Sequence, residues 1–176
     1  MSAVPVDWSQ WTVILLKPDC LARGLVRPVL EWVGRQVEVA DLRIVYPTER
    51  QVLAHYDDML PLSDQLGVDV PAELRRIYVG QPTGIALGYG TEAALRLRAI
   101  IGNTDPAVAA ADTIRGRFGD DDLRRARERG QLINNLIHSS DTTDVVARDY
   151  RIWYGRHHIH PLHPPSTREV RDDQQP

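Results

Sequence analysis

The segment Asn134-Asn135-Leu136-Ile137-His138-Ser139-Ser140-Asp141 places one histidine directly after a short apolar run and ahead of small hydroxyl residues. We interpret Leu132 to Ile137 as the last β-strand of the fold, because a short apolar run bounded by polar residues is typical of a buried strand. A histidine that follows such a strand lies at the edge of a sheet, where a ligand can approach the ring. The segment therefore predicts a terminal strand that presents His138 as a nucleophile.

Strand and helix patterns alternate on the N-terminal side of this segment. Thr12 to Leu16 is continuously apolar or β-branched, which predicts a strand buried on both faces. Val39 to Tyr46 and Thr83 to Tyr89 are predicted as two further strands. From Leu25 to Val37, apolar residues recur at helical spacing, which predicts an amphipathic helix between the first two strands.

Several helix ends are marked by capping residues. Thr48 with Gln51 forms a capping box for a helix towards Met59, and Asp69 with Pro71 marks another helix start. Further helices are predicted at Thr91 to Ile101, Leu123 to Gly130 and Asp141 to Trp153. Alternating strands and helices with short, mixed connections favour a two-layer α/β sandwich with an antiparallel sheet.

The composition narrows the functional classes. The chain has 176 residues, 43% of them apolar, and a net charge of -3, which fits one folded domain and argues against a general nucleic-acid or membrane-surface binder. No apolar run is long enough to span a membrane. The single cysteine, Cys20, fits a reducing cytoplasm. Lys17 is the only lysine among many arginines, so we expect a site that needs a compact cation.

Four short motifs occur in an order that resembles the nucleoside diphosphate kinase family. They are Lys17-Pro18-Asp19, Arg98 to Pro106, Thr113-Ile114-Arg115-Gly116 and the His138 segment. The resemblance covers residues 11 to 154, with insertions near 60–80 and 117–131. It implies an α+β fold, a ferredoxin-like βαββαβ sandwich whose four-stranded antiparallel sheet is covered by helices. We expect one domain over residues 1–154 and a flexible C-terminal tail over 155–176.

The resemblance also implies a ping-pong phosphotransfer from ATP to a nucleoside diphosphate. His138 matches the phosphorylated histidine, and neutral imidazole suits that role. Tyr56 matches a tyrosine whose hydroxyl contacts the nucleophile region, whereas His55 is interpreted as structural. Asp149 stands where the family has a glutamate that anchors the second ring nitrogen. Ser140 matches a serine beside the nucleophile.

The other implied residues bind the nucleotide. Arg98 and Arg115 match the arginines that clamp the phosphates. A guanidinium group suits this role because it can donate two parallel hydrogen bonds to one phosphate group. Thr104 matches a threonine that donates to phosphate, and Lys17 and Asn135 match residues that hold the ribose hydroxyls. The resemblance implies Mg²⁺ bound through the nucleotide phosphates, with no protein metal site. It also implies a homo-oligomer.

The chain departs from the family pattern on the base side of the site. No clear aromatic residue is available to stack on the base, and Tyr78 is a weak substitute. Ser139 replaces a glycine, Asn134 replaces an arginine, and Asp149 is one methylene shorter than glutamate. Residues 120–130 form an inserted charged helix near this region.

The sequence leaves three hypotheses about function open. The first is an active nucleoside diphosphate kinase, and the second is a catalytically impaired nucleotide-binding or interaction module. The third is a phosphohistidine kinase with a specialised acceptor. Ser140 or Asp141 has the alternative role of capping the last helix. The histidines between residues 157 and 163 are interpreted as part of a flexible tail rather than a metal site.

Overall fold

The computed structural model describes residues 5–155 and Leu162 of the chain. Its core is a four-stranded antiparallel sheet with the order β2-β3-β1-β4. The strands are β1 (Trp11–Leu16), β2 (Glu38–Val45), β3 (Thr83–Tyr89) and β4 (Ile137–Ser139). Both central strands, β1 and β3, match the sequence prediction closely. The predicted ferredoxin-like sandwich is confirmed.

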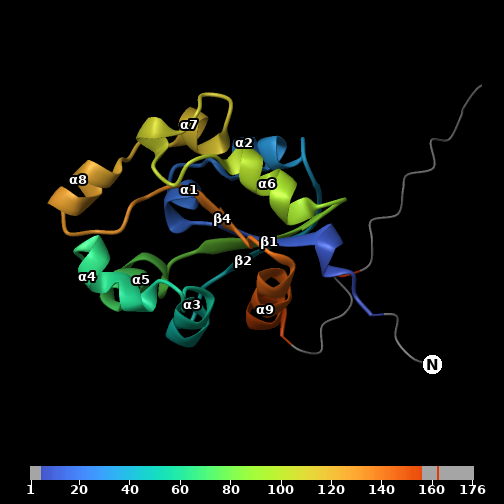
Figure 1. The fold of residues 1–176 in the computed structure, drawn as a ribbon, viewed down its shortest axis with the longest axis horizontal. Helices are drawn as coiled ribbons and strands as arrows, with labels where there is room; N and C mark the ends of the chain where they lie inside the picture. Colours follow the sequence, from blue (N-terminus) through green and yellow to red (C-terminus); the bar gives the residue numbers. More distant parts are fainter. Residues whose placement is uncertain (1–4, 156–161, 163–176) are drawn as a thin grey trace, which may run out of the picture.

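Helices connect and cover the strands (Figure 1). In chain order they are η1 (Trp8–Gln10), α1 (Pro18–Ala22), α2 (Val26–Val33), α3 (Glu49–His55), η2 (Leu60–Leu62), α4 (Ser63–Leu66), α5 (Val70–Tyr78), α6 (Ala93–Ile101), η3 (Pro106–Val108), α7 (Ile114–Phe118), α8 (Leu123–Glu128) and α9 (Thr143–Tyr154). Figure 1 shows α2, α6 and α7 on one side of the sheet and α3, α5 and α9 on the other.

The residues of β1 divide between two cores. All six are buried, and successive side chains of a strand point to opposite faces. Ile14 and Leu16 belong to the cluster that α2 and α6 cover. Val13 and Leu15 belong to the cluster that α9 covers. A third cluster joins α3 to α5, the helix of the 60–80 insertion.

Helix caps account for most of the predicted boundaries. Thr48 and Gln51 form the predicted capping box, and Asp69 accepts from the Ala72 amide at the start of α5. The inserted helix α8 begins at the Asp122 cap. Two predicted starts are wrong. Thr91 does not begin α6, whose N-cap is Glu92 in a left-handed conformation. Thr142, not Ser140 or Asp141, caps α9.

The last strand is shorter than predicted. The apolar run suggested Leu132 to Ile137, but only Ile137–Ser139 forms β4. Residues 132–136 leave the sheet because their backbone groups bond to Asp19, Lys17 and Arg115 instead. Helix α3 likewise ends at His55 rather than near Met59. Both differences place polar groups at the site described below.

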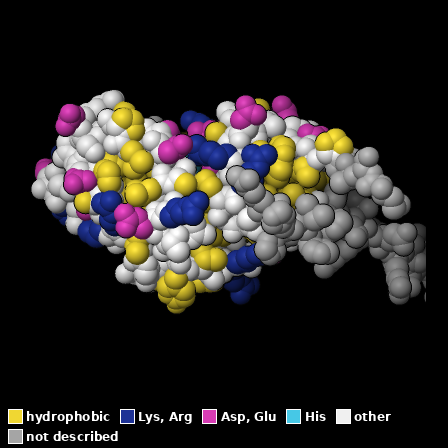
Figure 2. All heavy atoms as spheres, turned by 90° about the horizontal axis from the view of Figure 1, so that it is seen from below, with side chains coloured by type: hydrophobic (Ala, Val, Ile, Leu, Met, Phe, Trp, Pro, Cys, Tyr) yellow, Lys and Arg dark blue, Asp and Glu magenta, His cyan; other side chains and the backbone are white. Residues whose placement is uncertain are grey.

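On the face that Figure 2 shows, basic, acidic and apolar side chains are interspersed. Within residues 5–155, no helix combines the length and apolar character needed to cross a bilayer. The predicted tail histidines lie outside the described residues.

Candidate active site

His138 lies in the middle of β4, opposite Leu15 of β1. Its neighbours Ile137 and Ser139 are buried, whereas His138 is half-buried. Because side chains alternate along a strand, this pattern turns His138 alone towards the open side of β4. The sequence predicted a histidine beyond the strand end, and the structure places it inside the strand.

A clamp from the start of α1 fixes the segment before β4. The Lys17 amide donates to the Leu136 carbonyl at 2.8 Å, and the Asp19 carboxylate accepts from the Leu136 amide at 3.0 Å. Leu136 has φ +70°, a conformation that is costly for a branched residue. The two hydrogen bonds hold this turn, so Lys17 and Asp19 set the direction in which His138 leaves the chain.

The Lys17 ammonium is buried beside the same segment. Its Nζ donates to the Ile133 carbonyl at 3.1 Å and to Asn135 Oδ1 at 2.9 Å. Burial lowers the pKa of Lys17 to about 8, and the positive charge of Arg115 adds to this effect, although Asp19 opposes it. An ammonium has three N–H groups, so one remains for a ligand.

Arg115 is held by three backbone carbonyls. Its guanidinium donates to Asn135, Gly102 and Ile137 at 3.2, 3.2 and 2.7 Å. Burial lowers its pKa to about 10, which leaves the group protonated at neutral pH. A guanidinium has five N–H groups, and the remaining two form a fixed pair of donors beside β4.

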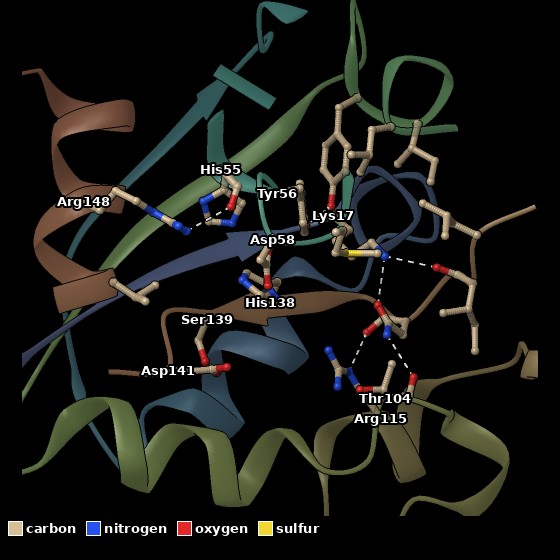
Figure 3. Close-up of a pocket in the computed structure, with 18 residues that line it drawn as sticks. Lys17, His55, Tyr56, Asp58, Thr104, Arg115, His138, Ser139, Asp141 and Arg148 are labelled. Carbon is tan, nitrogen blue, oxygen red and sulfur yellow. Dashed lines mark hydrogen bonds between the residues drawn. The ribbon is translucent and has the colours of Figure 1, made fainter. Parts of the chain in front are cut away.

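These groups line one cavity of about 340 Å³. Figure 3 shows His138 between His55 and Tyr56 on one side and Arg115 and Thr104 on the other. Asn135 also lines it, and its side-chain amide donates to the Thr104 carbonyl at 2.9 Å. The structure thus brings together a histidine, two buried cations and an amide from three separate sequence motifs, and Thr104 adds a fourth motif.

Arg98 lies outside that cavity and lines an adjoining one with Thr104, Arg115 and His138. Its guanidinium is 2.5 Å from the carboxylate of Asp141, and the two side chains are 62% and 48% exposed. An ion pair this exposed contributes about 0–1 kcal/mol to stability. Incoming phosphate oxygens can therefore replace Asp141 on Arg98 at little cost.

Tyr56 and Tyr78 close the inner wall. Their hydroxyls are 2.5 Å apart, and both side chains are buried. The ring centroid of Tyr56 is 5.4 Å from that of His138. Burial raises the pKa of both phenols, so both stay protonated. Because only 1% of Tyr78 is exposed, it offers no open ring face for a base.

His138 is held in its neutral form. Burial lowers its pKa to about 3, and its interaction with the His55 ring and the positive charges of Lys17 and Arg115 act in the same direction, although Asp149 opposes them. A neutral imidazole keeps one lone pair free for attack on phosphorus. The cations around it therefore serve two purposes, since they attract phosphate and keep the nucleophile unprotonated.

Asp149 does not meet the expectation that it anchors His138. Its carboxylate accepts from Ser140 Oγ at 2.8 Å and from Arg148 Nη2 at 3.1 Å, and it lies 3.2 Å from His55 Nδ1. Aspartate is one methylene shorter than the family's glutamate, so the carboxylate stops at His55. Ser140 supports this carboxylate and does not cap α9.

The sequence reasoning missed three contributors. The sequence predicts a structural role for His55, but its ring is buried beside both Asp149 and His138. The sequence predicts no role for Asp19, and it offers Tyr78 only as a weak candidate for base stacking. The His55-Tyr56 pair and the Lys17-Pro18-Asp19 motif were the available signals.

A family model described as "Nucleoside diphosphate kinase" matches residues 10–159. A protein from Streptococcus uberis named "Nucleoside diphosphate kinase" is 30% identical over 145 residues, which cover 82% of this chain and 93% of that protein.

Solved structures of proteins with the same name share the fold of this chain. A transition-state mimic of nucleoside-diphosphate kinase from Borrelia burgdorferi, with bound vanadate and ADP, aligns with a TM-score of 0.74 at 27% identity and covers 82% of this chain and 86% of the other. An NDP kinase from Pyrobaculum aerophilum aligns with a TM-score of 0.68 at 26% identity, covering 85% and 96% of the two chains.

Proposed function

The chain belongs to the nucleoside diphosphate kinase family, and from this we propose that it transfers the γ-phosphate of ATP to a nucleoside diphosphate through a phosphohistidine on His138. The observation that carries the proposal is the neutral imidazole beside two buried cations in one cavity. Phosphoryl transfer depends mainly on positioning and charge stabilisation, and this arrangement supplies both.

Two half-reactions complete the cycle. The lone pair of His138 forms an N–P bond while the P–O bond to ADP breaks, and the electrons leave with ADP. An acceptor diphosphate then attacks the phosphohistidine, and the lone pair returns to His138. The same cations serve both steps, because donor and acceptor carry the same phosphate chemistry.

Each predicted nucleotide contact has a proposed role. Arg115 and Arg98, which both line the adjoining cavity, hold the phosphates. Lys17 and Asn135 hold the ribose hydroxyls, and Thr104 donates to a phosphate oxygen. Tyr56 packs beside the His138 ring and limits its rotation.

We propose that Mg²⁺ arrives with the nucleotide. Among the described residues, no three His, Cys, Asp or Glu side chains lie together as candidate metal ligands. The residues that line the cavity fit an ion that is held by phosphate oxygens and water, which is how Mg²⁺ commonly binds nucleotides. The ion would neutralise phosphate charge and favour departure of the diphosphate.

Part of the cavity wall is apolar. Met59, Leu74, Ile77 and Leu132 line it, and no open aromatic face accompanies them among the lining residues. Aliphatic contacts are apolar and carry no hydrogen-bond code, so we propose that this enzyme discriminates weakly between bases. The same wall also suits a specialised phosphate acceptor, so a phosphohistidine kinase with such an acceptor is the second candidate function.

We also propose a homo-oligomer in the cytoplasm. Strand β2 is an edge of the sheet. Leu42 and Ile44 alternate along it and Tyr46 follows its last residue, with 43%, 52% and 68% exposure. Unpaired edge groups together with an apolar face favour pairing with another chain. The buried free thiol of Cys20 suits a reducing compartment.

Incubation with γ-labelled ATP and Mg²⁺ tests the function. We expect an acid-labile label that a diphosphate removes and that His138→Asn abolishes. Arg96→Ala, an exposed change on α6 outside the site, is the matched control. Folded protein that binds ADP and never takes up label would instead be a nucleotide-binding module.

A further inference from the structure

Carboxylates hold the backbone of the segment that leads into β4. The amides of three alternate residues each donate to a carboxylate, at 2.9 to 3.1 Å: Leu132 to Glu73, Asn134 to Asp121 and Leu136 to Asp19. Glu73 belongs to α5, and Asp121 lies just before α8. Two of the three carboxylates thus come from the segments that the family resemblance marks as insertions, so the insertions contact the backbone of the site.

One peptide group of this segment joins Asp121 to Lys17. Its carbonyl, that of Ile133, accepts from Lys17 Nζ at 3.1 Å, and its N–H, that of Asn134, donates to Asp121 Oδ2 at 3.1 Å. The C=O and N–H of a trans peptide point in opposite directions, so the carboxylate and the ammonium hold opposite ends of one rigid group. Because ~2.3 Å separates the O and N atoms of a peptide, the two charged atoms are at most ~8.5 Å apart.

The Asp121 carboxylate is ionised at neutral pH. Only 7% of the residue is exposed, and burial acts to raise its pKa, but the hydrogen bonds from Asn134 and Arg129 outweigh burial and lower the pKa. Arg129 donates to both carboxylate oxygens, at 3.0 and 2.8 Å, and its side chain is 40% exposed. Asp121 therefore carries a fixed negative charge behind the peptide that Lys17 contacts.

Groups from several elements act on the charge of Lys17. Burial lowers its pKa to about 8, Asp19 raises it, Arg115 lowers it and Asp121 raises it. His138, which is also coupled to Lys17, is neutral. Of the two acids, Asp19 belongs to the same motif as Lys17, whereas Asp121 reaches it from an insertion.

We propose that Asp121 is a positioning residue for nucleotide binding: it holds the N–H end of the Ile133–Asn134 peptide, so that the carbonyl end fixes the Lys17 ammonium in the cavity. Hydrogen bonds in series polarise one another, so the carboxylate strengthens the bond that the carbonyl accepts from Lys17. The next residue is Asn135, whose Oδ1 accepts from the same ammonium at 2.9 Å. This proposal rests on the proposed function, in which Lys17 and Asn135 hold the ribose hydroxyls.

Loss of the carboxylate should weaken nucleotide binding more than it slows chemistry. Asparagine at position 121 keeps an acceptor for the Asn134 amide and removes only the charge. We expect Asp121→Asn to raise the KM for ATP ~5-fold and to change kcat less than ~3-fold, because a contact made equally in the ground and transition states affects KM alone. Asp120→Asn is the matched control, since that carboxylate pairs with Arg23 and is 63% exposed. Both constants should there stay within ~2-fold of wild type.

A direct readout uses the fact that Lys17 is the only lysine of the chain. Protein labelled with ¹⁵N at lysine Nζ gives one side-chain signal, and its pH titration without nucleotide reports the charge of this ammonium. In Asp121→Asn the midpoint should fall by ~0.5, a ~3-fold loss of proton affinity. In Arg129→Gln, which removes the opposing positive charge, the midpoint should rise. Asp120→Asn should leave it unchanged.

The opposite signs separate the charge of Asp121 from general destabilisation, which does not raise the midpoint in one variant and lower it in the other. The proposal is overturned if the midpoint is equal in wild type and Asp121→Asn, or if Arg129→Gln lowers it. An unchanged KM for ATP in folded Asp121→Asn also overturns it. If Asp121→Asn does not fold, the sign found for Arg129→Gln decides, because that side chain is half-exposed.

Failure of the kinase function is distinguishable from failure of the positioning role. If His138 never takes up label, the proposed function fails, while the lysine titration still reports the coupling of Asp121 to Lys17. If labelling proceeds and the lysine midpoint does not respond to Asp121→Asn, the positioning role alone is wrong.

Discussion

Replacement of Lys17 by methionine tests whether the site holds a desolvated charge. Methionine is uncharged and of similar length, so it fills the space of the buried side chain. Lys17 donates to Ile133 and Asn135, and the substitution removes both hydrogen bonds at every pH. Nucleotide affinity should also fall, because the third N–H is lost. The informative quantity is how the free energy of unfolding changes with pH in the two proteins.

Burial lowers the pKa of Lys17 from 10.5 to about 8. The difference, about 2.5, corresponds to ~3 kcal/mol at ~1.36 kcal/mol for each factor of ten. Between pH 8 and 10.5 the unfolded chain keeps this proton while the folded protein releases it. Stability rises with pH wherever the unfolded state binds more protons. Wild-type stability should therefore rise relative to Lys17→Met by up to ~3 kcal/mol across this window.

Urea unfolding of both proteins at pH 7.5, 9 and 10.5 measures the difference directly. Because Lys17 is the only lysine of the chain, no other lysine titrates in this range. Arginine and tyrosine titrations are present in both proteins and largely cancel. If the stabilities of the two proteins changed with pH in parallel, burial would not lower the pKa of the Lys17 ammonium as we infer.

Three further changes test other parts of the structure. Gly116→Ala would place a Cβ 2.0 Å from the Ala110 carbonyl oxygen, so we expect a loss of about 3 kcal/mol in thermal unfolding. Arg98→Ala should change stability by less than about 1 kcal/mol, since its ion pair is exposed, and raise the KM for ATP about 10-fold, unlike the Arg96→Ala control. Because burial lowers the pKa of His138 to about 3, its imidazole resonances should stay those of the neutral ring down to pH 5. A midpoint near 6.5 would contradict this.

The fold was predictable where local chemistry decides it. Strands β1 and β3 follow from apolar, β-branched runs, and the Thr48 and Asp69 caps mark two helix starts. The ferredoxin-like topology came from the family resemblance, because alternation alone does not fix strand order. The predicted bounds of the last strand were wrong because the backbone groups of this segment bond to side chains that are distant in sequence. Hydropathy patterns contain no information about such bonds.

For the site, the motifs identified which residues meet but not how they pair. Lys17, Arg115, Asn135 and His138 line one cavity as the motif order suggested. The partner of Asp149 depended on the reach of one side chain, which a sequence position does not specify. The sequence therefore predicts only a structural role for His55, although its ring lies beside both Asp149 and His138.

The two buried cations explain why the nucleophile strand has only three residues. Lys17 and Arg115 donate to the carbonyls of Ile133, Asn135 and Ile137, so these carbonyl dipoles replace part of the hydration that the buried cations lose. A longer ladder between β4 and β1 would use those carbonyls in the sheet and leave the cations with fewer partners. The irregular segment is thus a consequence of building a phosphate site beside a sheet edge, and the strained Leu136 conformation is maintained by hydrogen bonds to Lys17 and Asp19.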